Sequence, residues 1–217
     1  MKEAVSFQNI YNISVDKSPD SAVFQEKSPE AKVRNLTING QGITFYRLGE
    51  DFSTRFSHDK SARSLCAKNN SDGIVLFELG EKKFIVICEL KSATGDIKKA
   101  LNQAESSYIK LCEALSICEP FDINCFSIVF IITAKDDPRY VDWMDKINKA
   151  LPADLEFIDV IALENYEHGM YYGESLADPQ TFAIPDDYHH NFVNKGVIVL
   201  YRTTESDTIV VDIKEFC

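Results

Sequence analysis

The sequence predicts a mixed α/β protein, with a central mixed β-sheet that helices flank. Two apolar runs of strand length, Ile74 to Leu79 and Phe84 to Leu90, are separated by the short turn Gly80-Glu81-Lys82-Lys83, which is typical of a β-hairpin. An amphipathic stretch over about 94–116 and a third apolar run, Phe126 to Ile132, follow. Strands that alternate with helices indicate a sheet whose faces helices cover.

The composition is that of a soluble globular protein with room for a sizeable core. The 217 residues are 45% hydrophobic and 26% charged, with a net charge of −11. Residues 1–135 hold 17 Lys/Arg and 17 Asp/Glu, whereas residues 136–217 hold 6 and 17, so the acidic excess lies entirely in the last 82 residues. These counts exclude a basic tail, a collagen repeat and a disordered acidic chain.

Residues 1–42 are expected to form an N-terminal helical segment. Ser18-Pro19-Asp20 and Ser28-Pro29-Glu30 each combine a Ser cap, a Pro at the first helical position and an acid in the first turn, which is the pattern of a helix start. After Gly40-Gln41-Gly42, the run Ile43 to Leu48 is expected to be the first strand.

Residues 43–165 are expected to form the core of the fold. Asn69 to Gly73 is a turn signal ahead of the hairpin, and the helix after the hairpin has apolar residues every three or four positions from Ile97 to Leu115. The pattern then predicts a second helix over Arg139 to Ala150 and a further strand over Leu155 to Leu163.

Residues 166–217 are expected to form an acidic loop and a C-terminal β-hairpin packed on the core. No sustained period is present from Gly169 to Gly196. The hairpin is predicted from two strand-like runs, Val197 to Arg202 and Thr208 to Ile213, which a polar turn separates.

The chain is expected to be cytoplasmic and to make no membrane contact. Its longest strictly apolar runs, such as Ile128 to Ile132, are five residues long, far from the roughly 20 needed to span a bilayer. The first residues lack the apolar stretch of a signal peptide. The six cysteines form no CxxC pair, so we expect all six to be reduced, with Cys88 and Cys112 buried in the core.

Two carboxylates and an ammonium group are predicted to meet at one end of the hairpin. Asp72 precedes its first strand, and Glu89 and Lys91 end its second strand on the same side, because side chains alternate along a strand. Two carboxylates can hold Mg²⁺, which keeps most of its waters and also takes a substrate phosphate. The alternative is that Asp72 caps a turn and that Glu89 pairs with Lys91 at a solvated strand end.

This arrangement resembles the PD-(D/E)xK nuclease superfamily, the fold of restriction endonucleases and Holliday-junction resolvases. The similarity rests on Ser71-Asp72-Gly73 and Glu89-Leu90-Lys91, with the hairpin between them and the amphipathic helix after them, and it covers roughly Ile43 to Leu163. Ser71 stands where the signature has Pro. The resemblance implies a restriction-endonuclease-like core.

The resemblance also implies roles for individual residues. Asp72 and Glu89 would bind Mg²⁺ or Mn²⁺, the backbone carbonyl of Leu90 would help, and Lys91 would be the catalytic lysine. An acid on an upstream helix is often a further ligand in this superfamily, and the candidates for it here are Glu30, Glu26 and Glu50.

A polar stripe flanks the apolar face of the helix after Lys91. It contains Lys99, Gln103, Ser106 and Lys110. The RecB-like branch of the superfamily has a Gln-x-x-x-Tyr motif on this helix, but Tyr108 comes one residue late and Ser107 takes the place of the tyrosine. The stripe either faces the site or is an ordinary solvated flank.

The first function hypothesis is a Mg²⁺- or Mn²⁺-dependent DNA endonuclease, a hydrolase of phosphodiester bonds of the restriction, defence or repair type. DNA affinity must come from local cations, because the net charge of the chain repels phosphate. The residues expected to contact DNA are Arg55, Lys60, Arg63, Lys68, Lys99 and Gln103.

The second hypothesis keeps the fold but not the catalysis. In it, the chain is an interaction module whose acidic C-terminal third binds a basic protein partner. A homodimer is compatible with either function. A nucleotide- or phosphate-binding α/β enzyme is the third alternative, although the sequence has no Gly-rich phosphate loop.

Overall fold

The computed structural model describes residues 1–52, 70–91, 97–116, 125–135, 158–162, 196–203 and 207–215. The described elements, in chain order, are α1 (Lys2–Tyr11), β1 (Val15–Gln25), β2 (Asn35–Leu48), β3 (Gly73–Leu79), β4 (Lys82–Lys91), α4 (Ile97–Leu115), β5 (Phe126–Lys135), β6 (Ile158–Ala162), β7 (Gly196–Thr203), β8 (Thr208–Asp212) and a short 3₁₀ turn (Ile213–Glu215).

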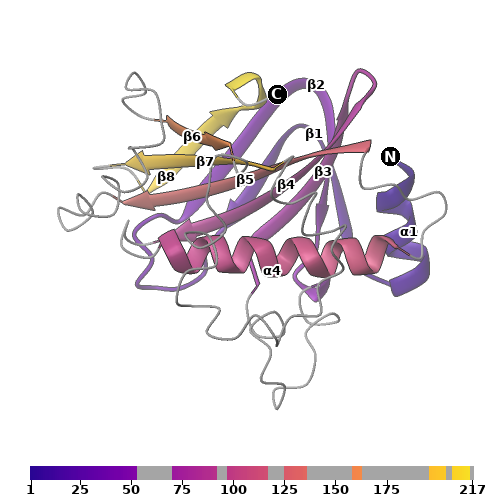
Figure 1. Ribbon diagram of the computed structural model, residues 1–217, viewed down its shortest axis with the longest axis horizontal. Coiled ribbons are helices and arrows are strands. Elements are labelled where there is room, and N and C mark those ends of the chain that lie inside the picture. The colour runs from indigo at the N-terminus through magenta and orange to yellow at the C-terminus, as the bar shows by residue number, and fades with distance from the viewer. Residues whose placement is uncertain are drawn as a thin grey trace, which may run out of the picture.

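The strands form one mixed eight-stranded sheet, which confirms the predicted mixed α/β class. The order is β1-β2-β3-β4-β5-β7-β6, and β8 pairs with β2. Neighbours from β1 to β4 are antiparallel, whereas β4–β5, β5–β7 and β2–β8 are parallel. Figure 1 shows α4 lying across one face of this sheet, with α1 beside the C-terminal end of α4, where the Tyr11 hydroxyl donates to the carbonyl of Ala114 at 2.7 Å.

Side-chain alternation along β4 divides the interior into two cores. Ile85 and Ile87 point to the face that α4 covers, where they join Tyr108 in one apolar cluster. Val86 and Cys88 point to the opposite face and belong to a second cluster. This second cluster is completed by side chains of β1, β2 and β8, which include Phe24, Leu36, Phe45, Ile209 and Val211.

The prediction of a helical segment over residues 1–42 is wrong beyond α1. Ser18-Pro19-Asp20 lies inside β1, where the register shifts between Pro19 and Ser21 and Asp20 adopts a positive φ of 62°. Proline is tolerated there because β1 ends the strand order and because a bulge needs no ladder hydrogen bond from it. Ser28-Pro29-Glu30 forms part of the turn between β1 and β2. A Ser-Pro-Asp triplet therefore marks a bulge here as readily as a helix cap.

The prediction of a C-terminal hairpin is also wrong, although both of its strands are present. β7 pairs with β5 and β6, and β8 pairs in parallel with β2. Strands close in sequence usually pair, but β8 instead covers the second core with Ile209 and Val211. Its pairing with β2 satisfies backbone groups that a hairpin would leave at the edge of the second core.

The other predicted elements divide into two groups. The strand predicted over residues 155–163 is confirmed as β6, and the hairpin and first helix of the core are confirmed as β3, β4 and α4. The helix predicted over residues 139–150 and the acidic loop over 166–195 lie outside the described residues. Among the described helices, none has the length and apolarity needed to cross a membrane.

Candidate active site

Asp72 and Glu89 meet at the open end of the β3–β4 hairpin. Gly73 pairs with Cys88 in the antiparallel ladder, which brings the residue before β3 opposite the last residues of β4. The N–H of Asp72 donates to Glu89 Oε2 at 3.2 Å, and the N–H of Leu90 donates to Asp72 Oδ2 at 2.6 Å. The convergence predicted from the sequence is therefore present, and the backbone holds each carboxylate.

Lys91 completes this group on the face of the sheet that α4 covers. Its ammonium forms an ion pair with Glu89 Oε1 and donates to Gln103 Oε1 at 2.6 Å. Glu89 is only 1% exposed and Lys91 9% exposed. The alternative is therefore right that Glu89 pairs with Lys91, but wrong that the pair lies at a solvated strand end.

Burial makes the two carboxylates costly to ionise together. Desolvation, followed by the charge of Asp72, raises the pKa of Glu89 to about 8, although Lys91 opposes this. Desolvation also raises the pKa of Asp72 to about 6, against the hydrogen bond from Leu90 and the charge of Lys91. Near neutral pH the pair therefore retains a proton that an added positive charge would displace.

Side chains from successive turns on one face of α4 hold the segment that leads into Asp72. Gln103 Nε2 donates to the carbonyl of Asn70 at 2.8 Å, and Lys110 Nζ donates to Asn70 Oδ1 at 2.6 Å. Between them, Ser107 Oγ lies 2.8 Å from both the N–H and the hydroxyl of Ser71. The helix thus fixes the backbone on which Asp72 stands.

The departure from the nuclease signature at Ser71 has a local explanation. The N–H of Ser71 donates to Ser107, and proline has no N–H to make this bond. The polar stripe on α4 does face the site, but it contacts the loop through Ser107 and not through the predicted Ser106. Residues 103, 107 and 110 are each about one helical turn apart and so share one face of the helix. This spacing is the signal from which Ser107 could have been predicted.

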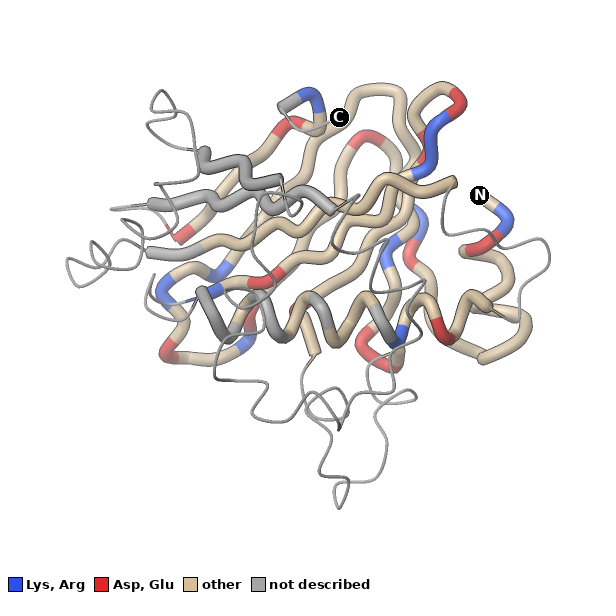
Figure 2. Tube along the Cα trace, viewed as in Figure 1, with Lys and Arg blue, Asp and Glu red and all other residues tan. Residues whose placement is uncertain are grey.

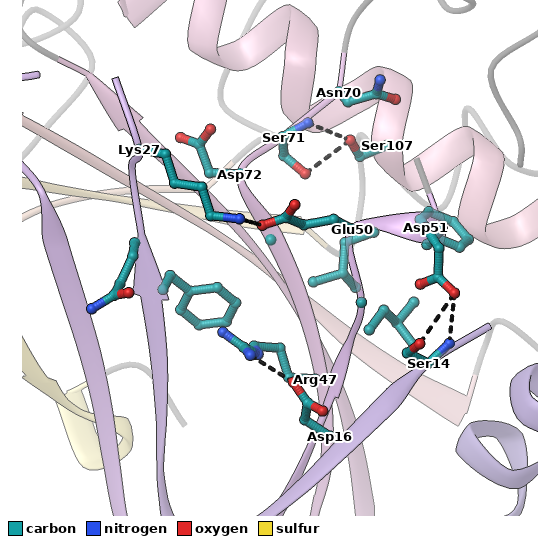
Figure 3. A pocket seen from close by; sticks show the side chains of 17 residues that line it. Ser14, Asp16, Lys27, Arg47, Glu50, Asp51, Asn70, Ser71, Asp72 and Ser107 are labelled. Carbon is teal, nitrogen blue, oxygen red and sulfur yellow. Dashed lines mark hydrogen bonds and ion pairs between the residues drawn. The ribbon is translucent and has the colours of Figure 1, made fainter. Parts of the chain in front are cut away.

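A cleft of about 600 Å³ opens beside Asp72. Figure 3 shows Asp72 with Ser71 and Ser107 at one end of it, the Lys27–Glu50 ion pair across its middle, and Arg47 with Asp16 beyond. None of Lys27, Arg47 or Asp16 was expected from the sequence to contribute to the site.

The donor set fits a divalent cation that prefers oxygen. Within the described chain, Asp72 Oδ1 is the one oxygen of the Asp72–Glu89 pair that accepts no protein hydrogen bond, and Asp72 lines the cleft. The described residues contain no group of three or more His, Cys, Asp or Glu side chains placed to hold a metal. Two carboxylates, together with waters, are nevertheless a ligand set that Mg²⁺ accepts.

The three upstream acids differ in where they lie relative to the cleft and to Asp72. Glu30 is exposed in the β1–β2 turn and does not line the cleft. Glu50 lines the cleft but forms an ion pair with Lys27. The charge of Glu26 acts on Asp72 and contributes to its raised pKa. Of the three candidates, Glu26 is therefore the one whose charge acts on Asp72.

Most of the cations predicted to contact DNA lie outside the described residues. Arg55, Lys60, Arg63 and Lys68 are outside the described residues, and only the backbone of Lys99 is described, in the first turn of α4. Figure 2 shows that the described charged residues lie mostly at strand ends and in turns, with both signs mixed.

Two of the cysteine predictions are confirmed, because Cys88 and Cys112 are buried free thiols, and Cys88 faces away from Glu89.

Comparisons of this chain with models of protein families, with characterised proteins and with solved structures find no match.

Proposed function

We propose that the chain is a Mg²⁺- or Mn²⁺-dependent nuclease that hydrolyses phosphodiester bonds in DNA. The observation that carries the proposal is the convergence of Asp72, Glu89 and Lys91 at one end of a buried sheet, beside an open cleft. Hairpin β3–β4, helix α4 and the parallel strand β5 follow one another in the order found in the restriction-endonuclease-like core that we propose for this fold.

The two carboxylates are the proposed metal ligands. A divalent ion at this position supplies a water of lowered pKa and neutralises negative charge on the phosphate. The chain contributes an anchored pair of oxygens, because backbone N–H groups orient Asp72 and Glu89 before any ligand arrives. Asp72 itself lines the cleft from which a substrate would approach.

Lys91 is the proposed catalytic lysine. Its ammonium lies beside Glu89 and is held by Gln103, so it keeps its place when charge develops on the phosphate oxygens nearby. A preorganised cation in a buried site stabilises such charge far better than a mobile surface lysine does. Gln103 acts as a positioning residue, because it contacts Lys91 and the loop before Asp72 but none of the reacting atoms.

A non-catalytic interaction module remains the second candidate. The observation that favours it is the Glu89–Lys91 ion pair, which already balances one carboxylate without any metal. In that case the site would serve stability, and the acidic excess after residue 135 would bind a basic protein partner.

Calorimetric titration with Mn²⁺, combined with a cleavage assay on plasmid and single-stranded DNA, separates the two candidates. We expect binding of Mn²⁺ by the wild type, loss of binding in Asp72→Asn, and loss of cleavage with retained Mn²⁺ binding in Lys91→Ala. Lys82→Ala, at the far end of the same hairpin, is the control. Undiminished cleavage by Asp72→Asn and Lys91→Ala would exclude the nuclease.

A further inference from the structure

We propose that the cleft beside Asp72 binds one or two nucleotides of a single DNA strand next to the scissile phosphate, with Lys27 and Arg47 contacting the phosphates. The inference rests on the proposed nuclease function, because it takes the Asp72–Glu89 pair as the place of cleavage. It adds the form of the substrate and two binding residues from the β1–β2 hairpin.

Lys27 and Arg47 lie along the same cleft as Asp72. Asp72 forms one end of the cleft, and Lys27 and Arg47 line it further along, as Figure 3 shows. Lys27 comes just after β1, and Arg47 lies near the end of β2. A strand whose reacting phosphate lies at Asp72 therefore continues past two cations in succession.

The volume of the cleft limits what it can hold. The cleft encloses about 600 Å³, which lies within the range of pockets that bury a drug-sized molecule. One or two nucleotides fit such a volume. A B-form duplex, whose major groove alone is about 12 Å wide, does not enter it, so this cleft takes a single strand or a frayed end.

Both cations can exchange their present partners for phosphate. Lys27 pairs with Glu50 across solvent, with side chains 72% and 79% exposed, and Arg47 pairs with Asp16 at 2.6 Å on the exposed rim. Exposed ion pairs contribute little to stability, so a phosphate replaces the carboxylate at little cost. Arg47 is already oriented, because its Nη1 donates to the carbonyl of Val23 at 2.6 Å.

The acids of the cleft make strand binding depend on a metal. Four acids, Asp16, Glu50, Asp51 and Asp72, line the cleft with only two cations, Lys27 and Arg47, so its described lining carries an acidic excess. This excess repels phosphate unless a bound cation neutralises part of it. We therefore expect the strand to bind only when a divalent ion is present.

Fluorescence anisotropy with a labelled eight-nucleotide single strand tests the inference, with Ca²⁺ in place of Mg²⁺ to suppress cleavage. Lys27→Ala and Arg47→Gln should each weaken binding about three- to tenfold and reduce the slope of log affinity against log salt by about 1. Lys82→Ala, an exposed lysine at the β3–β4 turn, is the matched control and should leave both unchanged. A blunt duplex of the same sequence should bind more weakly than the strand.

Three results would overturn the inference. These are full affinity in both Lys27→Ala and Arg47→Gln, equal losses in Lys27→Ala and Lys82→Ala, and tighter binding of the blunt duplex than of the single strand. Mn²⁺ calorimetry on the same proteins distinguishes the two proposals. Bound Mn²⁺ without strand binding rejects the cleft and leaves the metal site standing, whereas absent Mn²⁺ binding rejects the proposed function and this inference with it.

Discussion

The ring of Phe24 lies so close to the backbone of Gly73 that a Cβ at position 73 would come within 2.1 Å of ring atom Cδ1. No real Cβ contact is that short, so either the ring or the start of β3 must move when residue 73 gains a side chain. Phe24 is 1% exposed and belongs to the second core, which leaves it little freedom to move. The residue that follows Asp72 is therefore glycine for reasons of packing.

Gly73→Ala should accordingly distort the site as well as the core. We expect a loss of about 1–3 kcal/mol in the free energy of unfolding, as for other overpacked cores, together with weaker Mn²⁺ binding. Denaturant titration and calorimetry measure the two effects. The double variant Gly73→Ala/Phe24→Ala should lose less than the sum of its single changes; strict additivity would contradict the clash.

Gln103→Leu should slow catalysis without releasing the metal. Removing the acceptor for Lys91 and the donor to Asn70 is expected to lower kcat about tenfold or more, which corresponds to about 1.4 kcal/mol. Mn²⁺ affinity and KM should stay within about threefold, as measured by calorimetry and steady-state cleavage. Glu113→Ala, exposed on the same helix, serves as the control, and a change confined to KM would argue against a positioning role.

Ser107→Ala should destabilise the loop before Asp72. It leaves the N–H and hydroxyl of Ser71 without their partner, and an unsatisfied group that is partly buried costs about 1–3 kcal/mol. Hydrogen exchange at the Ser71 amide should quicken. Ser106→Ala is the matched control, since Ser106 and Ser107 are similarly buried at 4% and 3% exposed. Equal losses in the two variants would mean that the contact with Ser71 contributes nothing particular.

The stability of the metal-free protein should fall as the pH rises across the range of the raised carboxyl pKa values. The pKa of Glu89 rises from its ordinary value of 4.5 to about 8 and that of Asp72 from 3.8 to about 6, mainly through burial. The folded state therefore holds protons that the unfolded state releases, and this stabilisation is present below about pH 4 and is lost by about pH 8.

Thermal denaturation in a chelator from pH 5 to 8.5 measures this effect. Glu89→Gln should flatten the decline, and Mg²⁺ should raise the wild-type Tm most at the alkaline end. Glu81→Gln, exposed at the other end of the hairpin, should follow the wild type. A wild-type Tm that falls no more steeply with pH than the Tm of Glu89→Gln would contradict the raised pKa values.

The thiols should differ sharply in reactivity. Cys88 and Cys112 are buried and burial raises the pKa of each, that of Cys112 to about 12, whereas Cys125 is exposed. A thiol reagent applied to the native protein should therefore modify Cys125 in preference to the other two, which react only after unfolding. Peptide mapping by mass spectrometry identifies the modified positions. Early labelling of Cys88 would indicate that the second core opens readily.

The part of the fold that sequence predicts well is the part whose contacts are local. β3, β4 and α4 follow one another with short connections, and the apolar period of each element matches its geometry, as in Ile85 and Ile87 on one face and Val86 and Cys88 on the other. The partner of β8 is not predictable in this way. Its alternation indicates a half-buried strand, but nothing in residues 208–212 indicates that β2 is the strand it pairs with.

In the candidate site, too, only the residues brought together by local contacts can be predicted from the sequence. Asp72, Glu89 and Lys91 can be placed together from the hairpin alone, because antiparallel pairing returns the end of β4 to the start of β3. Lys27 and Arg47 cannot, since they reach the cleft through the fold of β1 and β2 around the bulge at Pro19. The triplet Ser18-Pro19-Asp20 predicts a helix start, and a helix here would place neither residue beside Asp72.

The pairing of β8 with β2 also has a consequence for the order in which the protein can fold during synthesis. Asn35 and Thr208 contact each other across 173 residues, whereas the proposed catalytic residues all lie between positions 70 and 110. A growing chain can therefore assemble the hairpin and α4 long before β8 leaves the ribosome, but Phe24, Phe45 and their neighbours wait for it with one side uncovered. Such non-local closure is slow, and during that interval we expect the nascent chain to expose apolar surface that the finished protein buries.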